Sequence, residues 1–202
     1  MKRSTTAVAE ARMEALTHED KTFDKLVQPG RAFHGRIFEQ CTFTRCDLSK
    51  SDFAKSRFID CTFIGCDLSM IKLRGASLQH VVFKECKLLG VDFSVCSEML
   101  FSPWFEQCIL DHSVFAGRRM AKTHFNRCSL KGVDFEQAEL NEAVFDTCDL
   151  QDAVFDRTQL RTADLTSAFN YRIDPERNDV LGARFSMDGA LSLLAKYGIV
   201  IE

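Results

Sequence analysis

The sequence predicts an all-β solenoid, a single tower built from a five-residue repeat. Thirteen successive fifth positions from Phe33 to Phe93, and fourteen more from Leu100 to Leu165, are all Phe, Leu or Met. Two residues before 23 of these 27 sites stands a small or short apolar side chain. An α-helix repeats about every 3.6 residues and a strand every two, so neither keeps every fifth residue on one side.

Individual pentads show which kind of solenoid this is. Ala163-Asp164-Leu165-Thr166-Ser167 and Cys66-Asp67-Leu68-Ser69-Met70 follow the pattern A-(D/N)-L-x-x, and they resemble the pentapeptide-repeat family over roughly residues 31–169. The resemblance implies a right-handed quadrilateral β-helix with four pentads in each coil.

Residues 20 positions apart are alike, which supports four pentads per coil and about seven coils. With two extra residues near 94–99 treated as a bulge in one corner, the fourth face carries only Leu, from Leu48 to Leu150. The third face carries Phe from Phe43 to Phe145. Because both columns continue across the interruption, residues 31–169 are predicted to form one continuous tower.

All nine cysteines fall in the small-residue register. Neighbours in a column would have Cβ atoms about 4.8 Å apart, wider than the roughly 3.8 Å that a disulfide needs, so we expect free thiols in a reducing cytoplasm. The cysteines would form a ladder along the tower, and a ladder does not bring four ligands to one point, so no metal site is expected.

The five histidines lie on different pentads and are expected to be exposed. Without nucleotide-binding or metalloprotease motifs, we predict no enzyme activity and no cofactor.

Aspartates commonly stand directly before the central residue of a pentad. At that site the side chain should face outward and stabilise the turn by bonding to local backbone. The residues concerned are Asp47, Asp67, Asp92, Asp134, Asp149 and Asp164.

Charge is unevenly distributed along the chain, whose net charge is -3. Residues 31–130 contain 14 bases and 10 acids, whereas residues 131–170 contain 3 bases and 9 acids. Because a coil takes 20 residues, these acids should encircle the tower as an acidic belt, and we define its members as Asp134, Glu136, Glu139, Glu142, Asp146, Asp149, Asp152 and Asp156. The belt is either a solvated rim or an imitation of DNA phosphates for a basic groove on a partner. The sequence predicts no basic surface that would bind nucleic acid directly, and no segment that would cross or anchor to a membrane.

An apolar patch is expected at the bulge. Leu100 and Phe105 are expected to point inward. Met99, Phe101 and Trp104 then face outward together and form an apolar patch that should be buried against another surface. Either the N-terminal segment, residues 1–30 with a possible helix from Ala7 to about Thr17, packs there, or the patch binds a partner.

The C-terminal region, residues 170–202, is predicted to close the tower. Ser186 is a plausible N-cap for a helix from Met187 to about Tyr197, ended by Gly198. The tail carries more apolar surface than covering one coil end requires, so we predict a two-fold homodimer. Its interface residues are expected to be Leu191, Leu194, Tyr197 and Ile199.

Residues 173–178 and 191–201 also resemble the C-terminus of the Qnr quinolone-resistance and McbG microcin-immunity branch of the family. This resemblance implies a cytoplasmic bacterial homodimer that imitates DNA, binds DNA gyrase or topoisomerase IV, and protects it from quinolones or similar poisons. This chain has a two-residue bulge where the better-known Qnr members carry long loops. The alternative is a solenoid scaffold for an unknown protein partner.

Overall fold

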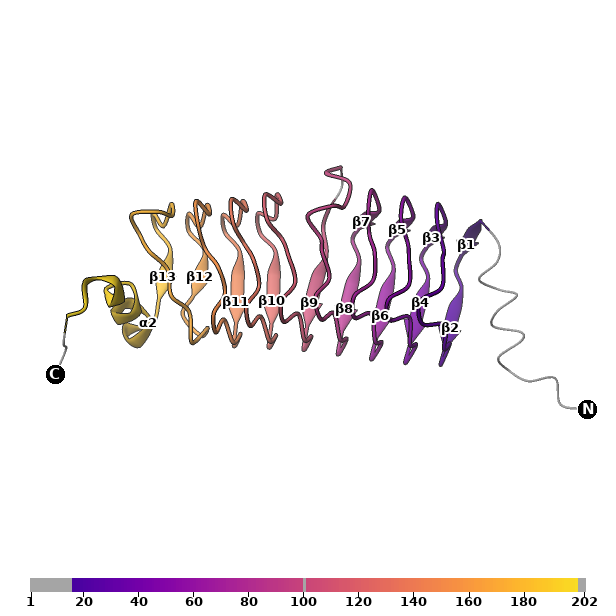
Figure 1. The fold of residues 1–202 in the computed structure, drawn as a ribbon, viewed down its shortest axis with the longest axis horizontal. Helices are drawn as coiled ribbons and strands as arrows, with labels where there is room; N and C mark the ends of the chain where they lie inside the picture. The colour runs from indigo at the N-terminus through magenta and orange to yellow at the C-terminus, as the bar shows by residue number, and fades with distance from the viewer. Residues whose placement is uncertain (1–15, 100, 200–202) are drawn as a thin grey trace, which may run out of the picture.

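The computed structural model describes residues 16–99 and 101–199, which form a straight tower of stacked coils (Figure 1). A four-stranded parallel sheet, β1-β3-β5-β7, runs along one face, and a nine-stranded parallel sheet from β2 to β13 runs along another. Partners are 20 residues apart, as for Phe43 with Phe63. Across the bulge the interval becomes 22, where Phe83 pairs with Phe105.

Each strand is only two or three residues long, because every coil turns a corner after each pentad. The remaining faces are joined by isolated bridges and backbone hydrogen bonds, such as Leu48 N to Asp67 O at 2.9 Å. The strands are β1 (Thr17–Glu19), β2 (Thr22–Asp24), β3 (Ile37–Glu39), β4 (Thr42–Thr44), β5 (Arg57–Ile59), β6 (Thr62–Ile64), β7 (Ser77–Gln79), β8 (Val82–Lys84), β9 (Trp104–Glu106), β10 (His124–Asn126), β11 (Val144–Asp146), β12 (Asp164–Leu165) and β13 (Arg184–Phe185).

The predicted columns form the core. Every described central residue from Phe33 to Leu165 is buried. Ring planes in a column are nearly parallel, with centroids 4.4 Å apart for Phe43 and Phe63. Rings of adjacent faces meet edge to face, so the tower interior is one continuous aromatic and aliphatic stack.

The small-residue register also supplies hydrogen-bond donors. Cys66 Sγ lies 3.4 Å from the carbonyl oxygen of Phe43 in the coil below, and Ser56 Oγ donates to the carbonyl of Phe33 at 2.7 Å. These small donors therefore link each coil to carbonyl groups in the core of the preceding coil. This explains why cysteine, serine and threonine accompany alanine in this register.

The nine thiols are expected to stay silent toward Ellman's reagent in the native protein and to react fully in guanidinium chloride. All nine are free and buried, so the reagent cannot reach the sulfur atoms while the tower stays folded. Absorbance titration with and without denaturant checks this, and rapid reaction of several thiols in the native state would contradict the packing.

The turn-stabilising role predicted for aspartate is confirmed. In each case one carboxylate oxygen accepts a hydrogen bond from the backbone N–H two residues later, at 2.8 to 3.2 Å. The residues are Asp47, Asp67, Asp92, Asp134, Asp149 and Asp164.

The tower begins earlier than residue 31. Strand β1 starts at Thr17, and Phe23 in β2 is already buried. The expectation that all five histidines are exposed is wrong for His18, which is buried and stacks on Phe38 at 4.9 Å, because it occupies the central site 20 residues earlier. The helix expected from Ala7 lies outside the described residues, apart from its last positions, where Thr17 belongs to a strand.

At the bulge the inward residue differs from the prediction. The amide of Ser102 donates to the carbonyl of Leu78 at 2.9 Å, which places Phe101 above Leu78 in the second column. Phe101 is consequently buried, and the expectation that it faces outward is wrong. Leu100, expected to point inward, lies outside the described residues.

Arg118 supports the bulge from the next coil. Its guanidinium donates to the carbonyls of Cys96 at 2.9 Å and Ser97 at 2.8 Å, and lies 4.2 Å from the centre of the Phe101 ring. Burial lowers the pKa of Arg118 from its ordinary value. A long side chain at a position normally occupied by a small one therefore marks the place where the corner widens.

The tower ends later than residue 169, since β13 pairs with β12. Helix α2 (Met187–Ser192) begins after Ser186 as predicted, with the Ser186 hydroxyl accepting from Gly189 N at 3.0 Å. It ends earlier than predicted and gives way to a 3-10 turn, η1 (Ala195–Tyr197). A Cβ atom at position 189 would lie 1.7 Å from the Tyr171 hydroxyl oxygen, so only glycine fits here. No helix among the described residues has the length and apolar character to cross a membrane.

Candidate partner-binding surface

The acidic belt surrounds the tower on all four faces. Asp134, Glu136 and Asp156 flank the central phenylalanines of the first face, whereas Asp146 follows Phe145 on the third. Glu139 and Glu142 lie beside Leu140 on the second face, and Asp149 and Asp152 lie beside Leu150 on the fourth. No single face therefore carries a continuous row of carboxylates.

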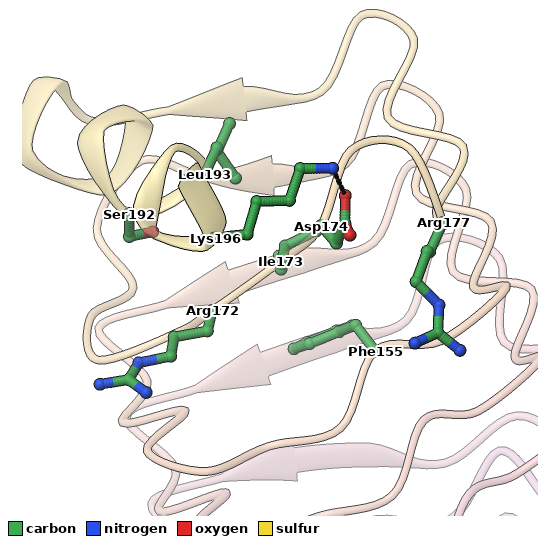
Figure 2. A pocket seen from close by; sticks show the side chains of 8 residues that line it. All are labelled: Phe155, Arg172, Ile173, Asp174, Arg177, Ser192, Leu193 and Lys196. Atoms are coloured by element: carbon green, nitrogen blue, oxygen red, sulfur yellow. Dashed lines mark hydrogen bonds and ion pairs between the residues drawn. The ribbon is translucent and has the colours of Figure 1, made fainter. Parts of the chain in front are cut away.

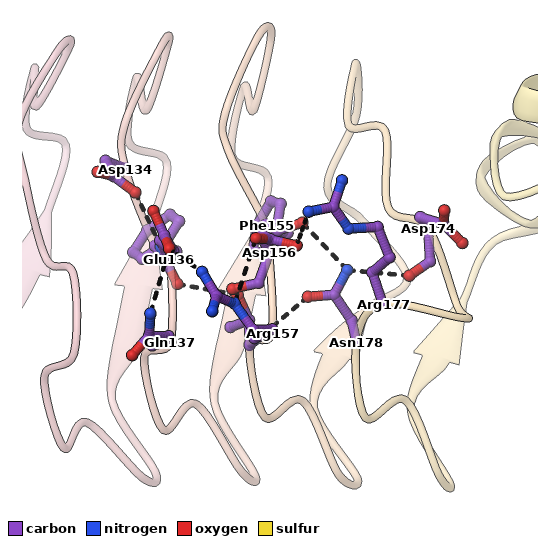
Figure 3. Close-up of polar contacts among 11 residues, drawn as sticks. Asp134, Glu136, Gln137, Phe155, Asp156, Arg157, Asp174, Arg177 and Asn178 are labelled. Atoms are coloured by element: carbon purple, nitrogen blue, oxygen red, sulfur yellow. Dashed lines mark hydrogen bonds and ion pairs between the residues drawn. The ribbon is translucent and has the colours of Figure 1, made fainter.

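Most belt members are paired with bases from adjacent coils. Figure 3 shows one connected series of ion pairs, in which Arg157 contacts Glu136 and Asp156. Arg177 also binds Asp156, at 2.7 Å. The other pairs are Arg119 with Glu139 at 3.4 Å, Lys122 with Glu142 at 3.6 Å and Lys131 with Asp149 at 3.2 Å. Five of the eight carboxylates thus have a cation within 4 Å, which reduces the field that they project.

Asp149 is held in place by several contacts. It accepts hydrogen bonds from Gln151 N at 3.2 Å and from the side-chain amide of Asn170 at 2.8 Å. Burial opposes ionisation, but the bonds from Asn170 and Lys131 outweigh it and hold the pKa of Asp149 below its usual value. This carboxylate is part of the tower's structure as well as of its surface.

Three belt members form no ion pair with another described residue: Asp134, Asp146 and Asp152. Within the described part of the chain, the Asp146 carboxylate accepts hydrogen bonds from the hydroxyls of Thr147 and Ser167, both at 3.0 Å. Asp146 and Asp152 are exposed, and Asp134 is half-buried. These carboxylates can meet a partner's cations without first giving up an ion pair.

The pairing bases were missed in the sequence because they are distant along the chain. Arg119 precedes Glu139 by 20 residues and Arg177 follows Asp156 by 21, so each base occupies the adjacent coil. The same 20-residue interval that aligns the core columns would have revealed these pairs.

The patch at the bulge is smaller than expected, because Phe101 is buried. Met99 is 74% exposed and Trp104 is 45% exposed. The Trp104 indole stacks on His124 one coil away, with centroids 5.0 Å apart and planes within 5°. The result is a flat aromatic pair on the nine-stranded face, and Met99 protrudes from the bulge.

The C-terminal cap, which we define as residues 186–199 with α2 and η1, is apolar on its outer side. Leu191, Leu194, Tyr197 and Ile199 are all exposed in the single chain. Leu193, by contrast, packs against the core. Lys196 ties the cap to the tower through Asp174 and Glu176.

Together these features define a parallel β-solenoid whose interior is fully packed and whose chemistry lies on its outer faces and ends. Among the described residues no cluster of three or more His, Cys, Asp or Glu side chains could hold a metal ion. The family model named pentapeptide repeat region matches residues 36–99 and 97–165. The chain therefore belongs to the pentapeptide-repeat family, whose fold is the right-handed quadrilateral β-helix.

Solved structures with the same architecture include those of QnrB1, described as a plasmid-mediated fluoroquinolone resistance protein. One trypsin-treated QnrB1 variant has a TM-score of 0.62 and 21% identity, covering 93% of this chain and 99% of that chain. A second has a TM-score of 0.60 and 22% identity, covering 93% and 98%. At this identity the likeness concerns the fold. No curated protein matches this chain.

Proposed function

We propose that this protein is a non-enzymatic cytoplasmic binding protein that docks on a type II topoisomerase, DNA gyrase or topoisomerase IV, by imitating DNA. The observation that carries the proposal is the acidic C-terminal part of a rod-shaped tower. Residues 119–179 contain twelve acids and eight bases, so a net negative charge remains after the ion pairs are counted. The fold is also that of QnrB1, described as a plasmid-mediated fluoroquinolone resistance protein.

The test is gyrase supercoiling with added purified protein, with and without ciprofloxacin, across a salt series. Inhibition at low micromolar protein, or rescue from the drug, supports the proposal. The effect should weaken as salt rises, because exposed charges are screened beyond about 8 Å at physiological ionic strength. Absence of both effects at low salt would reject a topoisomerase as the partner.

A second candidate function is a scaffold for a different protein, bound through Met99 and Trp104. The exposed Trp104–His124 pair favours it, since tryptophan is enriched in binding hot spots. In the supercoiling assay Trp104→Ala should leave activity unchanged if the acidic belt is the working surface. Loss of activity in this variant would instead place the topoisomerase contact at Trp104. The scaffold function is favoured if the parent has no effect on supercoiling and captures another protein that Trp104→Ala does not.

We also propose a two-fold dimer through the outer side of α2 and the following turn. Leu194→Glu should convert the dimer to a monomer, because it places a charge in an apolar interface. Ile109→Glu is a matched control, since Leu194 and Ile109 are equally exposed at 38% and Ile109 lies midway along the tower. Light scattering measures the outcome, and a dimer that persists in Leu194→Glu would show that the interface lies elsewhere.

A further inference from the structure

The C-terminal end of the tower contains a hollow of about 310 Å³ between the last coil and the cap (Figure 2). Its base is Phe155, the last ring of the first-face column, which stacks on Phe135 at 5.3 Å. The next level of this column would be filled by Pro175. Residues 174–177 instead form a turn, closed by Arg177 N to Asp174 O at 3.1 Å.

The lining of the hollow is partly apolar and partly polar, since Asp174 and Ser192 also line it. Ile173 from the last coil and Leu193 from the cap line it together with Phe155. The site therefore continues the column of the core by one position, and none of the described side chains occupies it. A flat ring or a branched aliphatic group fits such an environment, because rings in this column already stack about 5 Å apart.

The rim is cationic. Figure 2 shows Arg172 and Arg177 on opposite sides of Phe155, with Lys196 above. Lys196 is bound to Asp174 at 2.5 Å and Arg177 to Asp156 at 2.7 Å. Arg172 is exposed, and it forms no ion pair within the described part of the chain. Its guanidinium can bind a carboxylate in the bidentate manner typical of arginine.

The hollow and the proposed dimer surface lie on different sides of α2. Ser192 and Leu193 face the tower and line the hollow, whereas Leu191 and Leu194 are exposed on the outer side. Dimer formation through the outer side therefore leaves the hollow in place. Its volume lies at the lower end of the range for small-molecule sites, roughly 300 to 1,000 Å³.

We propose that this hollow is a binding site for a small aromatic carboxylate, with the ring over Phe155 between Ile173 and Leu193 and the carboxylate on Arg172. The site needs both parts of the ligand. A ring without a charge leaves Arg172 unused, and a small anion without a ring leaves the apolar part of the lining uncovered. This inference is independent of topoisomerase binding.

The probe is 2-naphthoate, titrated into the full-length protein by calorimetry and followed by ligand-observed NMR. Arg172→Gln should weaken binding about tenfold, the usual effect of losing one charge-assisted hydrogen-bonding partner. Arg127→Gln removes the same charge from an exposed mid-tower position and should change nothing. Neutral 2-naphthol and acetate should each bind at least tenfold more weakly than 2-naphthoate.

Leu193→Trp provides a second variant, because the larger side chain should fill the hollow and abolish binding; circular dichroism checks that it stays folded. The proposal is overturned if 2-naphthoate shows no saturable binding to the parent. It is also overturned if Arg172→Gln and Arg127→Gln bind the probe equally well.

Discussion

Replacing Phe125 by alanine is expected to lower the free energy of unfolding by about 3–5 kcal/mol. The ring is fully buried and lies between two parallel neighbours in its column, Phe105 at 5.3 Å and Phe145 at 5.1 Å. Phe115 and Phe135 contact it edge to face, each at 6.0 Å. The substitution therefore removes four ring contacts and leaves a cavity that rigid neighbouring coils cannot close.

Denaturant unfolding followed by circular dichroism measures this effect. Phe169→Ala is the control, because Phe169 is 46% exposed on the outside of the tower and should cost far less. Each coil contacts mainly its neighbours, so a lesion midway along the tower should also broaden the transition by uncoupling the two halves. An unchanged melting curve for Phe125→Ala would contradict the stacked core.

The interior of this fold could be predicted almost completely from the sequence, because each inward site is defined by one period. The limits of the tower were harder to predict. At the start, His18 takes a site that later coils fill with Phe or Leu, and it interrupts the apolar pattern although the 20-residue interval to Phe38 is kept. Phe23 keeps the same interval to Phe43 and indicated that the tower begins before residue 31.

The bulge shows a different limit. Leu100 and Phe101 are both apolar, so periodicity alone could not determine which of the two occupies the second column. The hydrogen bond from Ser102 N to Leu78 O and the contact with Arg118 identify Phe101. Both depend on residues about 20 positions away, beyond the reach of a local pattern.

The belt shows why counting charges along the chain overestimates the negative potential that a surface presents to a partner. Residues 131–170 have a large excess of acids, yet the bases that pair with them include Arg119, Lys122 and Arg177, outside that window. Ion pairs between exposed side chains are individually weak, about 0–1 kcal/mol. They nevertheless determine which carboxylates a partner can reach without competition.

Neutralising the unpaired carboxylates is expected to reduce the effect on gyrase at least tenfold. The variant is Asp134→Asn, Asp146→Asn and Asp152→Asn, in which asparagine can still accept the turn hydrogen bond at position 134. These three side chains offer charge that no base of the tower already holds. The half-maximal protein concentration in the supercoiling assay is the quantity to measure, at low and at physiological salt.

The matched control is Glu136→Gln, Glu139→Gln and Glu142→Gln, which changes the net charge by the same amount but removes carboxylates already paired with Arg157, Arg119 and Lys122. It should weaken the effect less, because a partner must displace those bases before it can use the glutamates. Equal losses in both variants would mean that net charge alone matters. Full activity in both would show that the belt is a solvated rim and would reject DNA imitation by this part of the tower.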